Sequence, residues 1–479
     1  MPDGRTRFEE LASGKLGAIL FKYSWPALVA MTLNTLYAVV DRFWIGRGCG
    51  EAAMTGLTLV FPVVMLFAAF GMFVGAGHSA VLSIKLGEGD RDTCEKLLGE
   101  LVAIKLLFFC VLPPLVFFNL DTVLAWCGGD KVSPEAFECA RTYLGLVVFS
   151  HLFSHLAFGL SALMRAEGAA LSSMACMVVG FGTNLVLDPF FIFDCCFFGH
   201  SFGLGLGVAG AAWATNVAMF ASCAFALWRY LARKTVVRLR FSRIRLYWNL
   251  VVRTSAIGFA PFASQLLASL INLSLQLAFA KWAPDKASAT TQIASLGVFE
   301  AALMLTLTPV IGAQLGIQPI IGYNWGARNY RRVRDALVMG LWITTALCFL
   351  SFVVQVIPPF PELVARIFVE GDNPRLVEIA SRDLALSNCM IWTIGLNIVA
   401  TTYFQAIGHP GTAIILSTMR QGFIMLPVIW FLPYLMEDKT LAIWLSMPVS
   451  DVLCCLATLP PFLLNVRFLS RVRERRRRS

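Results

Sequence analysis

Long runs of apolar residues, separated by short polar segments, follow one another from residue 16 to residue 466. A helix that crosses a membrane needs about 20 mostly apolar residues, and each run is long enough. We therefore predict twelve membrane-spanning helices, over residues 16–44, 52–85, 95–119, 137–165, 169–193, 206–230, 250–280, 290–322, 333–358, 381–406, 412–435 and 440–466. Several runs exceed the minimum length, so we expect those helices to tilt or to extend beyond the lipid.

The composition of the chain supports this interpretation. Of the 479 residues, 58% are hydrophobic and 14% are charged, whereas soluble domains contain about 25% charged residues. These fractions exclude an ordinary soluble enzyme, a disordered chain and a nucleic-acid-binding module. The excess of 39 Lys and Arg over 29 Asp and Glu does not indicate nucleic acid, because the basic residues lie in the gaps between the apolar runs.

Lys and Arg residues are divided unevenly between those gaps. Every second gap, together with the two ends of the chain, holds most of them. Loops rich in Lys and Arg stay on the cytoplasmic side of a membrane. We therefore expect a multi-pass protein of the inner cell membrane with both termini in the cytoplasm. The N-terminal tail covers residues 1–15, and a basic tail covers residues 467–479.

A basic segment over residues 231–249 divides the chain into halves that resemble each other. Glycines and a four-residue motif recur in the second half after about 240 residues: Gly77 and Gly87 match Gly316 and Gly326, and Arg165–Gly168 matches Gln405–Gly408. Matches so far apart that keep one offset are typical of an internal duplication.

Each half therefore contains six predicted helices, an N-lobe over residues 16–230 and a C-lobe over residues 250–466. Six is even, so the two copies share one orientation in the membrane. We predict an all-α integral membrane protein in which two six-helix bundles surround a central cavity, which is a plan typical of transporters.

Four polar residues in the predicted spans of the N-lobe are suited to bind a cation: Asp41, Asn184, Asp188 and Thr215. Asn184 and Asp188 are four residues apart and so share one face of a helix. Carboxylate, amide and hydroxyl oxygens suit a hard cation such as Na+. The two carboxyl groups would alternatively share a proton, because close like charges favour protonation of one of them. In a third interpretation, Asp41 and Asp188 are unrelated residues at the membrane boundary.

The C-lobe lacks a counterpart of this set, because Ile424 and Val428 occupy the positions equivalent to Asn184 and Asp188. Its own polar residues within predicted spans are candidates for lining a substrate cavity: Gln276, Glu300, Arg420 and Asp451. Arg420 and Asp451 would alternatively neutralise each other as a structural pair, since buried charges are usually paired. Glu300 stands alone in an apolar stretch and is the better cavity candidate.

Other patterns do not support a cofactor site. Gly205, Gly207 and Gly210 match a dinucleotide-binding motif, but no strand precedes them. His151 and His155 are four residues apart without an evident third metal ligand, and are interpreted as polar helix contacts. The scattered cysteines indicate free thiols. We expect no enzymatic activity and no cofactor.

Four segments, in this order along the chain, read SWPALVAMTLNTLYAVVDRFWIGRGCG, AAMTGLTLVFP, GTNLVLDPFFIF and GIQPIIGYNWGARN. Together they resemble the multidrug and toxic compound extrusion (MATE) family, and its bacterial drug-efflux branch in particular. The resemblance covers about residues 15–467. It implies that Asp41, Asn184, Asp188 and Thr215 form the family's cation site. It also suggests that the first span bends at Pro26 as Asp41 changes state; a proline within a helix favours a kink in any case.

By this resemblance the protein is a secondary active multidrug efflux transporter. It would export amphipathic, often cationic compounds by alternating access, in antiport with Na+ or H+. We expect a monomer in the lipid bilayer that does not bind nucleic acid. The alternative is a flippase for a lipid or a lipid-linked oligosaccharide, which belongs to the same superfamily. A flippase would favour a strongly basic cavity, whereas the charged residues within the spans are mainly acidic.

Overall fold

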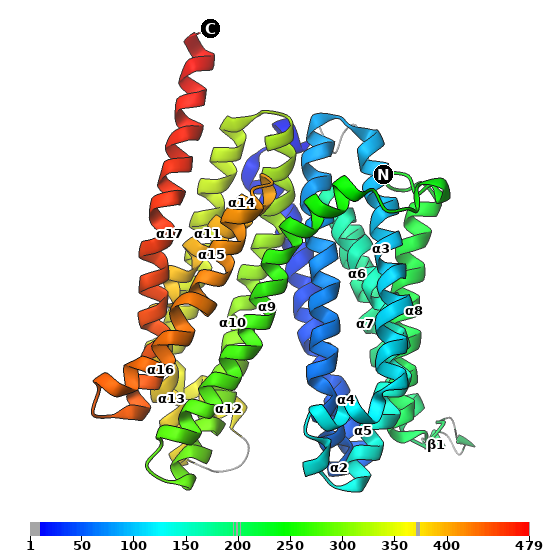
Figure 1. Ribbon diagram of the computed structural model, residues 1–479, viewed down its shortest axis with the longest axis vertical. Coiled ribbons are helices and arrows are strands. Elements are labelled where there is room, and N and C mark those ends of the chain that lie inside the picture. The colour runs from blue at the N-terminus through cyan, green and yellow to red at the C-terminus, as the bar shows by residue number, and fades with distance from the viewer. Residues whose placement is uncertain (1–9, 195, 198–199, 202, 370–373, 479) are drawn as a thin grey trace. The chain divides into compact units, whose positions relative to one another are not determined.

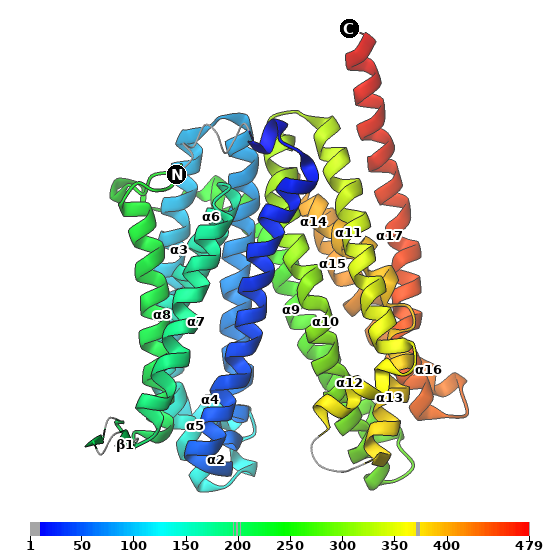
Figure 2. The same cartoon turned by 180° about the vertical axis from the view of Figure 1, so that it is seen from behind.

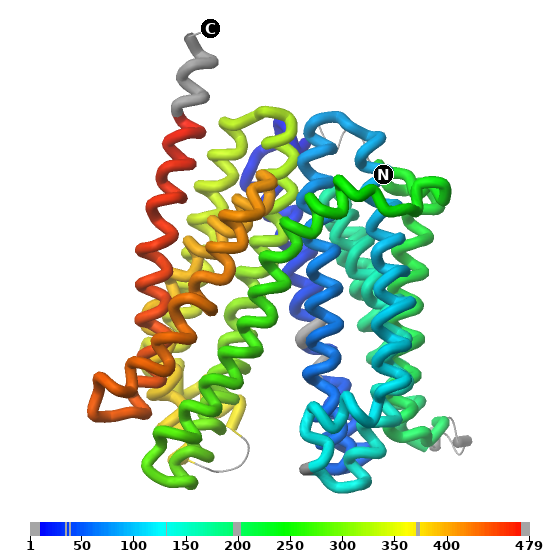
Figure 3. The backbone as a smooth tube through the Cα atoms, in the orientation of Figure 1, coloured from blue at the N-terminus to red at the C-terminus, as the bar shows by residue number. Residues whose placement is uncertain are grey.

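The structure is a computed structural model that describes residues 10–194, 196–197, 200–201, 203–369 and 374–478, traced in Figure 3. Almost all of these residues are helical (Figure 1). Within them, twelve helical segments are long and apolar enough to cross a membrane, which confirms the predicted number. Many large apolar side chains on these helices are exposed, including Phe220, Trp342 and Phe423, as expected for surfaces that face lipid.

The first two predicted spans are joined in one helix, α2 (Leu16–Glu88), of 73 residues. Its regular backbone is interrupted at Gly50, which has a φ of 75°. Glycine adopts this left-handed conformation without the steric cost that a side chain would bring. The two spans therefore meet at a kink within a helix rather than at a loop.

The helices and strands that follow α2 in the first half of the chain are short or of single-span length. They are α3 (Arg91–Phe118), α4 (Leu120–Trp126), η1 (Gly129–Lys131), α5 (Pro134–Val147), η2 (Val148–Ser150), α6 (His151–Ala166), α7 (Ala170–Ile192), β1 (Cys196–Phe197), β2 (His200–Ser201), α8 (Gly207–Leu231) and η3 (Phe241–Arg243). The strands β1 and β2 pair antiparallel. Side-chain caps begin two of the helices: Asp90 accepts from the Thr93 amide before α3, and Ser133 accepts from the Ala136 amide before α5.

The second half of the chain is built in the same way. Its elements are α9 (Trp248–Trp282), α10 (Lys286–Gly326), α11 (Tyr330–Val356), α12 (Phe360–Phe368), α13 (Pro374–Asn388), η4 (Ile391–Thr393), α14 (Ile394–Ala406), α15 (Pro410–Thr418), η5 (Met419–Met425), α16 (Leu426–Leu435) and α17 (Lys439–Arg478). The predicted span over 412–435 is thus divided by a π-helical turn, η5. Such turns are frequent at functional sites.

The chain forms two compact units. The first unit comprises Val29–Gly258, and the second comprises Glu10–Leu28 together with the residues from Phe259 onward. The two lobes predicted over 16–230 and 250–466 are not tested by this division. The units differ from those lobes because the beginning of α2 lies in the second unit and the beginning of α9 lies in the first.

Close backbone contacts at glycines hold the beginning of α9 in the first unit and the beginning of α2 in the second. In the first unit, Gly77 lies against the Thr254 carbonyl and Gly258 lies against the Phe73 carbonyl, so that a Cβ at either glycine would overlap the facing oxygen. In the second unit, Gly316 lies against the backbone of Ser24. Gly77 and Gly316 are the glycines that the sequence repeat matched with each other, so the repeat preserves the kind of contact as well as the residue.

Helices α5 to α8 pack together within the first unit, and α7 lies beside α8 along its length (Figure 2). Small residues allow this approach: Gly180 of α7 faces Ser222 of α8, whose Oγ donates to the Cys176 carbonyl at 2.8 Å. Small residues at such contacts let helix backbones come close in a membrane. This packing fixes the face of α7 that carries Asn184 and Asp188.

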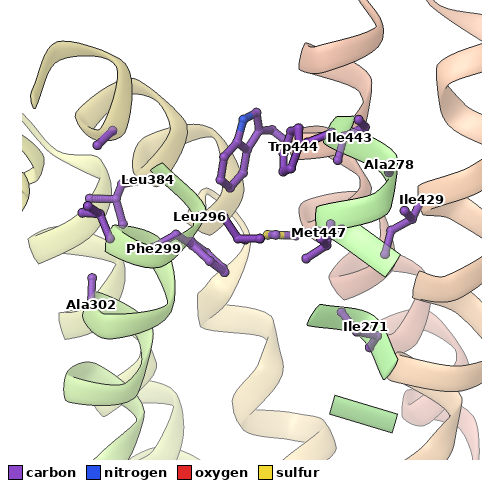
Figure 4. Packing of buried hydrophobic residues seen from close by; sticks show 14 of the residues in the cluster. Ile271, Ala278, Leu296, Phe299, Ala302, Leu384, Ile429, Ile443, Trp444 and Met447 are labelled. Atoms are coloured by element: carbon purple, nitrogen blue, oxygen red, sulfur yellow. The ribbon is translucent and has the colours of Figure 1, made fainter. Parts of the chain in front are cut away.

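The core of the second unit is apolar around Trp444. Phe299, Leu296 and Met447 belong to the same cluster (Figure 4). The Trp444 indole N–H donates to Gln292 Oε1 at 2.6 Å, so its buried polar atom has a partner.

The basic segment over 231–249 lies against the first unit through ion pairs. Arg243 contacts Asp92 at 2.6 Å and Arg240 contacts Glu95 at 3.0 Å. The hydrogen bond to Asp92 raises the pKa of the Arg243 guanidinium. Glu167 also holds this segment, because its Oε2 accepts from the Val236 amide at 2.9 Å while its Oε1 accepts from the Tyr230 hydroxyl at 3.1 Å.

Candidate functional site

Asp41 of α2 and Asp188 of α7 form the centre of a buried polar site in the first unit. Their relative exposures are 7% and 0%, and the two carboxyl groups lie close enough to interact with each other. Two ionised carboxylates at such a position repel each other, so a proton or a bound cation would stabilise the pair. The predicted proximity of Asp41 and Asp188 is present in the structure.

Asn184 lies one turn before Asp188 on the same face of α7. Its Nδ2 donates to Asp188 Oδ1 at 2.9 Å, and its side chain is 1% exposed. The amide thus presents its nitrogen to the carboxyl pair, not the oxygen that a hard cation would require.

Thr215 of α8 joins the site through two tyrosines. The hydroxyls of Tyr37 and Thr215 are 3.4 Å apart, and Tyr143 also forms a hydrogen bond with Thr215. Both tyrosines lie close enough to Asp41 and Asp188 to interact with them electrostatically. The structure therefore brings all four predicted residues into one site, with Thr215 at its edge.

The sequence analysis missed Tyr37 and Tyr143. Tyr37 had a detectable signal, since it lies four residues before Asp41 and so on the same face of α2. It stacks on Phe181 of α7 with ring centroids 5.3 Å apart. Tyr143 lies on α5, and nothing in the sequence linked it to the aspartates.

Two carboxyl oxygens of this site remain without a hydrogen-bond partner among the described residues, Asp41 Oδ1 and Asp188 Oδ2. Buried polar atoms are almost always paired. These two oxygens can accept from a bound ligand. The donor set fits a proton, and for Na+ the Asn184 amide would have to present its oxygen.

Pro26 lies in the part of α2 that belongs to the second unit, whereas Asp41 lies in the first. The interruption of regular backbone angles within α2 is at Gly50. The proposed bending at Pro26 stays a prediction.

Arg420 and Asp451 form an ion pair in the second unit. Arg420 Nε donates to Asp451 Oδ1 at 2.6 Å, and the Asp451 side chain is 2% exposed. Arg420 lies within the π-helical turn η5, which is held against α17. Of the two interpretations of these residues, the structure favours the structural pair.

Glu300, which stands alone in its apolar stretch of sequence, has polar partners on another helix. Asn272 of α9 donates to Glu300 Oε1, and Gln276 donates to Asn272 Oδ1 at 2.5 Å. Glu300 and Gln276 are exposed. Asn272 lies four residues before Gln276 on the same helix, but the sequence did not link it to Glu300, which lies on α10. A further missed residue, Asp383, is buried and accepts from the Ser295 hydroxyl at 2.7 Å.

Among the described residues, no three His, Cys, Asp or Glu side chains are grouped to hold a metal ion. The described cysteines are free.

The family model MatE matches residues 26–190 and 262–431, which is most of the chain. The chain belongs to the MATE family. MATE proteins are multi-pass membrane transporters and not enzymes, and the family is one of multidrug efflux. The two matched segments contain Asp41, Asn184 and Asp188 in the first and Gln276, Glu300 and Arg420 in the second.

Named relatives and solved structures agree with membership of the MATE family. The multidrug export protein MepA of Staphylococcus aureus is 24% identical over 445 residues, which cover 92% of both chains. A crystal structure of MATE in the bent conformation has a TM-score of 0.87 at 19% identity and covers 98% of this chain and 99% of the other. The MATE multidrug transporter DinF-BH, solved as a complex, has a TM-score of 0.82 at 27% identity and covers 94% of this chain and 96% of the other. These likenesses confirm the predicted all-helical fold.

Proposed function

We propose that this MATE transporter exports amphipathic, often cationic compounds across the cell membrane in exchange for H+ or Na+, by alternating access. The observation that carries the proposal is the buried pair of neighbouring carboxyl groups, Asp41 and Asp188. Burying ionisable groups within a membrane is costly, so such residues are usually functional. The names of the relatives, a multidrug export protein and a multidrug transporter, support the substrate class.

H+ is the coupling ion that the geometry favours. The two buried carboxyl groups lie close together, so that one proton would relieve their mutual repulsion, and the Asn184 amide donates to Asp188 instead of offering its oxygen. The site is therefore arranged as a proton-holding dyad. Loss of that proton would leave two adjacent carboxylates that repel each other.

Helix α2 provides a physical link between ion binding and conformational change. It carries Asp41 in the first unit, and its residues before Val29 belong to the second unit. A change of charge at Asp41 therefore acts on a helix that both units contain. For antiport, the ion must bind the two conformations of the transporter unequally, since equal binding would shift no population.

The orientation of the transporter in the membrane and its oligomeric state also belong to the proposal. The basic gaps and tail place both termini in the cytoplasm by the positive-inside rule. We propose a monomer, in which Asp41, Asn184, Asp188 and Thr215 of one chain make up the carboxyl site.

Transport into proteoliposomes, with a Na+ gradient and a pH gradient imposed separately, tests the proposal. Ethidium uptake by the wild type is expected to follow the pH gradient. The variants Asp41→Asn and Asp188→Asn are expected to lose uptake while they retain the elution profile and thermal stability of the wild type. Asp121→Asn, a change at an exposed aspartate of the same unit, is the matched control. Uptake by either dyad variant at the wild-type rate would contradict the proposed site, and uptake driven by neither gradient would contradict antiport.

A further inference from the structure

A second group of titratable side chains lies on one face of α2, apart from the aspartate dyad. Two nitrogen donors bind carbonyls of this face: Lys105 Nζ donates to the Gly71 carbonyl at 3.0 Å, and His78 Nδ1 donates to the Val74 carbonyl at 2.9 Å. The ring of His155 lies beside the ring of Phe67, with ring centroids 6.3 Å apart. Phe67, Gly71 and Val74 follow one another at helical spacing and extend over about 10 Å of α2.

A small pocket lies beside this group. It is lined by Lys105 and His155 of the group, by His151, and by Phe67, Phe108 and Leu112. Lys105 is 1% exposed. His151 stacks flat on Phe67 with ring centroids 4.3 Å apart, and the rings of His151 and His155 are 5.7 Å apart. The pocket has room for about one water molecule.

The nitrogens that face this pocket are not satisfied by protein groups. Nε2 of His151 and Nε2 of His155 are buried, and neither has a hydrogen-bond partner among the described residues. A neutral imidazole has one ring nitrogen that carries a lone pair and can accept a proton. A lone pair of this kind, next to an ammonium, is suited to accept a proton, directly or through a water molecule.

The charge balance around Lys105 is unusual. No carboxylate of the described chain forms an ion pair with Lys105. Lys105 and His155 interact electrostatically, and so do His155 and His151. The titratable groups on the packed elements are His151 and His155 from α6, His78 from α2 and Glu100 from α3. Glu100 lies 3.6 Å from His78 Nε2. A buried ammonium without a counter-ion costs several kcal/mol, so the group is stable only when the nitrogens hold few protons.

We propose that Lys105, His151 and His155 form a second proton-binding site in the first unit, distinct from Asp41 and Asp188. One proton is held by Lys105 Nζ or by Nε2 of a histidine, and it is released to water when the pocket opens. No other co-reactant is needed. The proposal rests on the proposed export function for its consequence, because proton release here gives export a pH dependence that the dyad does not provide. Proton binding itself can be measured without transport.

Histidine ring signals in the purified transporter, followed by NMR in lipid nanodiscs from pH 3 to pH 9, test the site directly. Single replacements His151→Gln and His155→Gln assign the two rings. In the wild type, both rings are expected to titrate together, as coupled groups do. In Lys105→Met, their midpoint is expected to rise, because removal of a neighbouring positive charge favours the protonated imidazole. The matched control is Lys96→Met, which removes an exposed lysine of the same helix that is paired with Asp92.

The same NMR measurements can also overturn the proposal. Rings that show no titration across this range in the wild type, or an unchanged midpoint in Lys105→Met, would exclude a shared proton. A response of the rings to chloride at constant pH, without a response to pH, would indicate an anion site instead.

The pH dependence of ethidium uptake provides the second measurement. Lys105→Met and His155→Gln are expected to shift the pH of half-maximal uptake by about one unit and to leave the KM for ethidium unchanged. Unshifted profiles would contradict the transport consequence. Absence of uptake by the wild type would contradict the proposed function, while the NMR titration would still decide the proton site.

Discussion

Gly77 faces the carbonyl oxygen of Thr254 so closely that a Cβ on residue 77 would overlap it. Its counterpart in the repeat, Gly316, lies against Ser24, and a Cβ on residue 316 would overlap the Ser24 Oγ and backbone nitrogen. The two contacts attach the beginning of α9 to the first unit and the beginning of α2 to the second unit. They are the points at which each unit receives a helix segment from the other half of the chain.

Alanine at Gly77 or Gly316 is therefore expected to destabilise the protein. The facing atoms are backbone at Gly77 and include the backbone nitrogen and Cα of Ser24 at Gly316. They cannot move aside, so the helices must separate, at a cost of about 1–3 kcal/mol. Thermal unfolding in detergent measures this effect. Gly182→Ala and Gly297→Ala are the matched controls, because no atoms lie within 4 Å of a Cβ at either position. Equal unfolding midpoints for Gly77→Ala and Gly182→Ala would show that the close contact does not matter.

Removal of the hydroxyls around the carboxyl dyad is expected to weaken export without abolishing it. Tyr37→Phe and Tyr143→Phe each delete one hydrogen bond to Thr215, and one such bond contributes about 1 kcal/mol. Roughly a fivefold loss of ethidium uptake follows from that energy, which is a much smaller loss than that expected for Asp188→Asn. Initial uptake rates in proteoliposomes measure the difference. Complete loss of uptake in Tyr143→Phe would assign that hydroxyl a direct role in binding the ion.

The pair of Arg420 and Asp451 is expected to behave as a structural unit. Arg420→Met leaves a buried carboxylate without its partner and is expected to cost about 3–5 kcal/mol of stability. The double variant Arg420→Met/Asp451→Leu removes both charges and is expected to recover most of that stability. Arg366→Met breaks an exposed pair with Glu362 and is the control of small effect. Drug uptake by a stable double variant would exclude a substrate-binding role for the pair, and loss of uptake would support one.

Glu167 is expected to hold the connecting segment against the first unit. Its carboxylate accepts from the Val236 amide and from the Tyr230 hydroxyl, so Glu167→Ala leaves buried donors unsatisfied at a cost of about 1–3 kcal/mol. The segment over 231–249 is then expected to be cut faster by trypsin than in the wild type. Glu95→Ala, which removes one ion pair with the exposed Arg240, is the comparison variant. Equal cutting rates in Glu167→Ala and the wild type would contradict this role.

The sequence predicted the features that depend on local pattern. Apolar runs gave the twelve spans, and the spacing of Asn184 and Asp188 placed both on one face of α7, as observed. The high cost of an acid in a span singled out Asp41. Tyr143 could not be found in this way, since its place beside Thr215 depends on how α5 packs in the first unit. The partner of Glu300 was missed for the same reason, because Asn272 lies on another helix.

The boundaries of the two units were also beyond local pattern. The repeat separates the chain at its midpoint, whereas packing moves the beginning of α2 into the second unit. Composition does not distinguish these alternatives, because the residues before Val29 are as apolar as the rest of the span. The sequence indicated this exchange only through Gly77 and Gly316, because a glycine has no side chain and lets another segment of the chain come close.

The exchange of helix beginnings has a consequence for the synthesis of the protein. Asn324 donates to the carbonyl of Leu11, which lies 313 residues earlier in the chain. Ser24 likewise contacts Gly316, so both contacts form only after the second half of the chain has been synthesised. When the ribosome has released the first helix, its partners in the second unit do not yet exist. The start of α2 must therefore wait in the membrane until α10 is inserted. A chain truncated in the connecting segment would leave that end without the helix on which it packs.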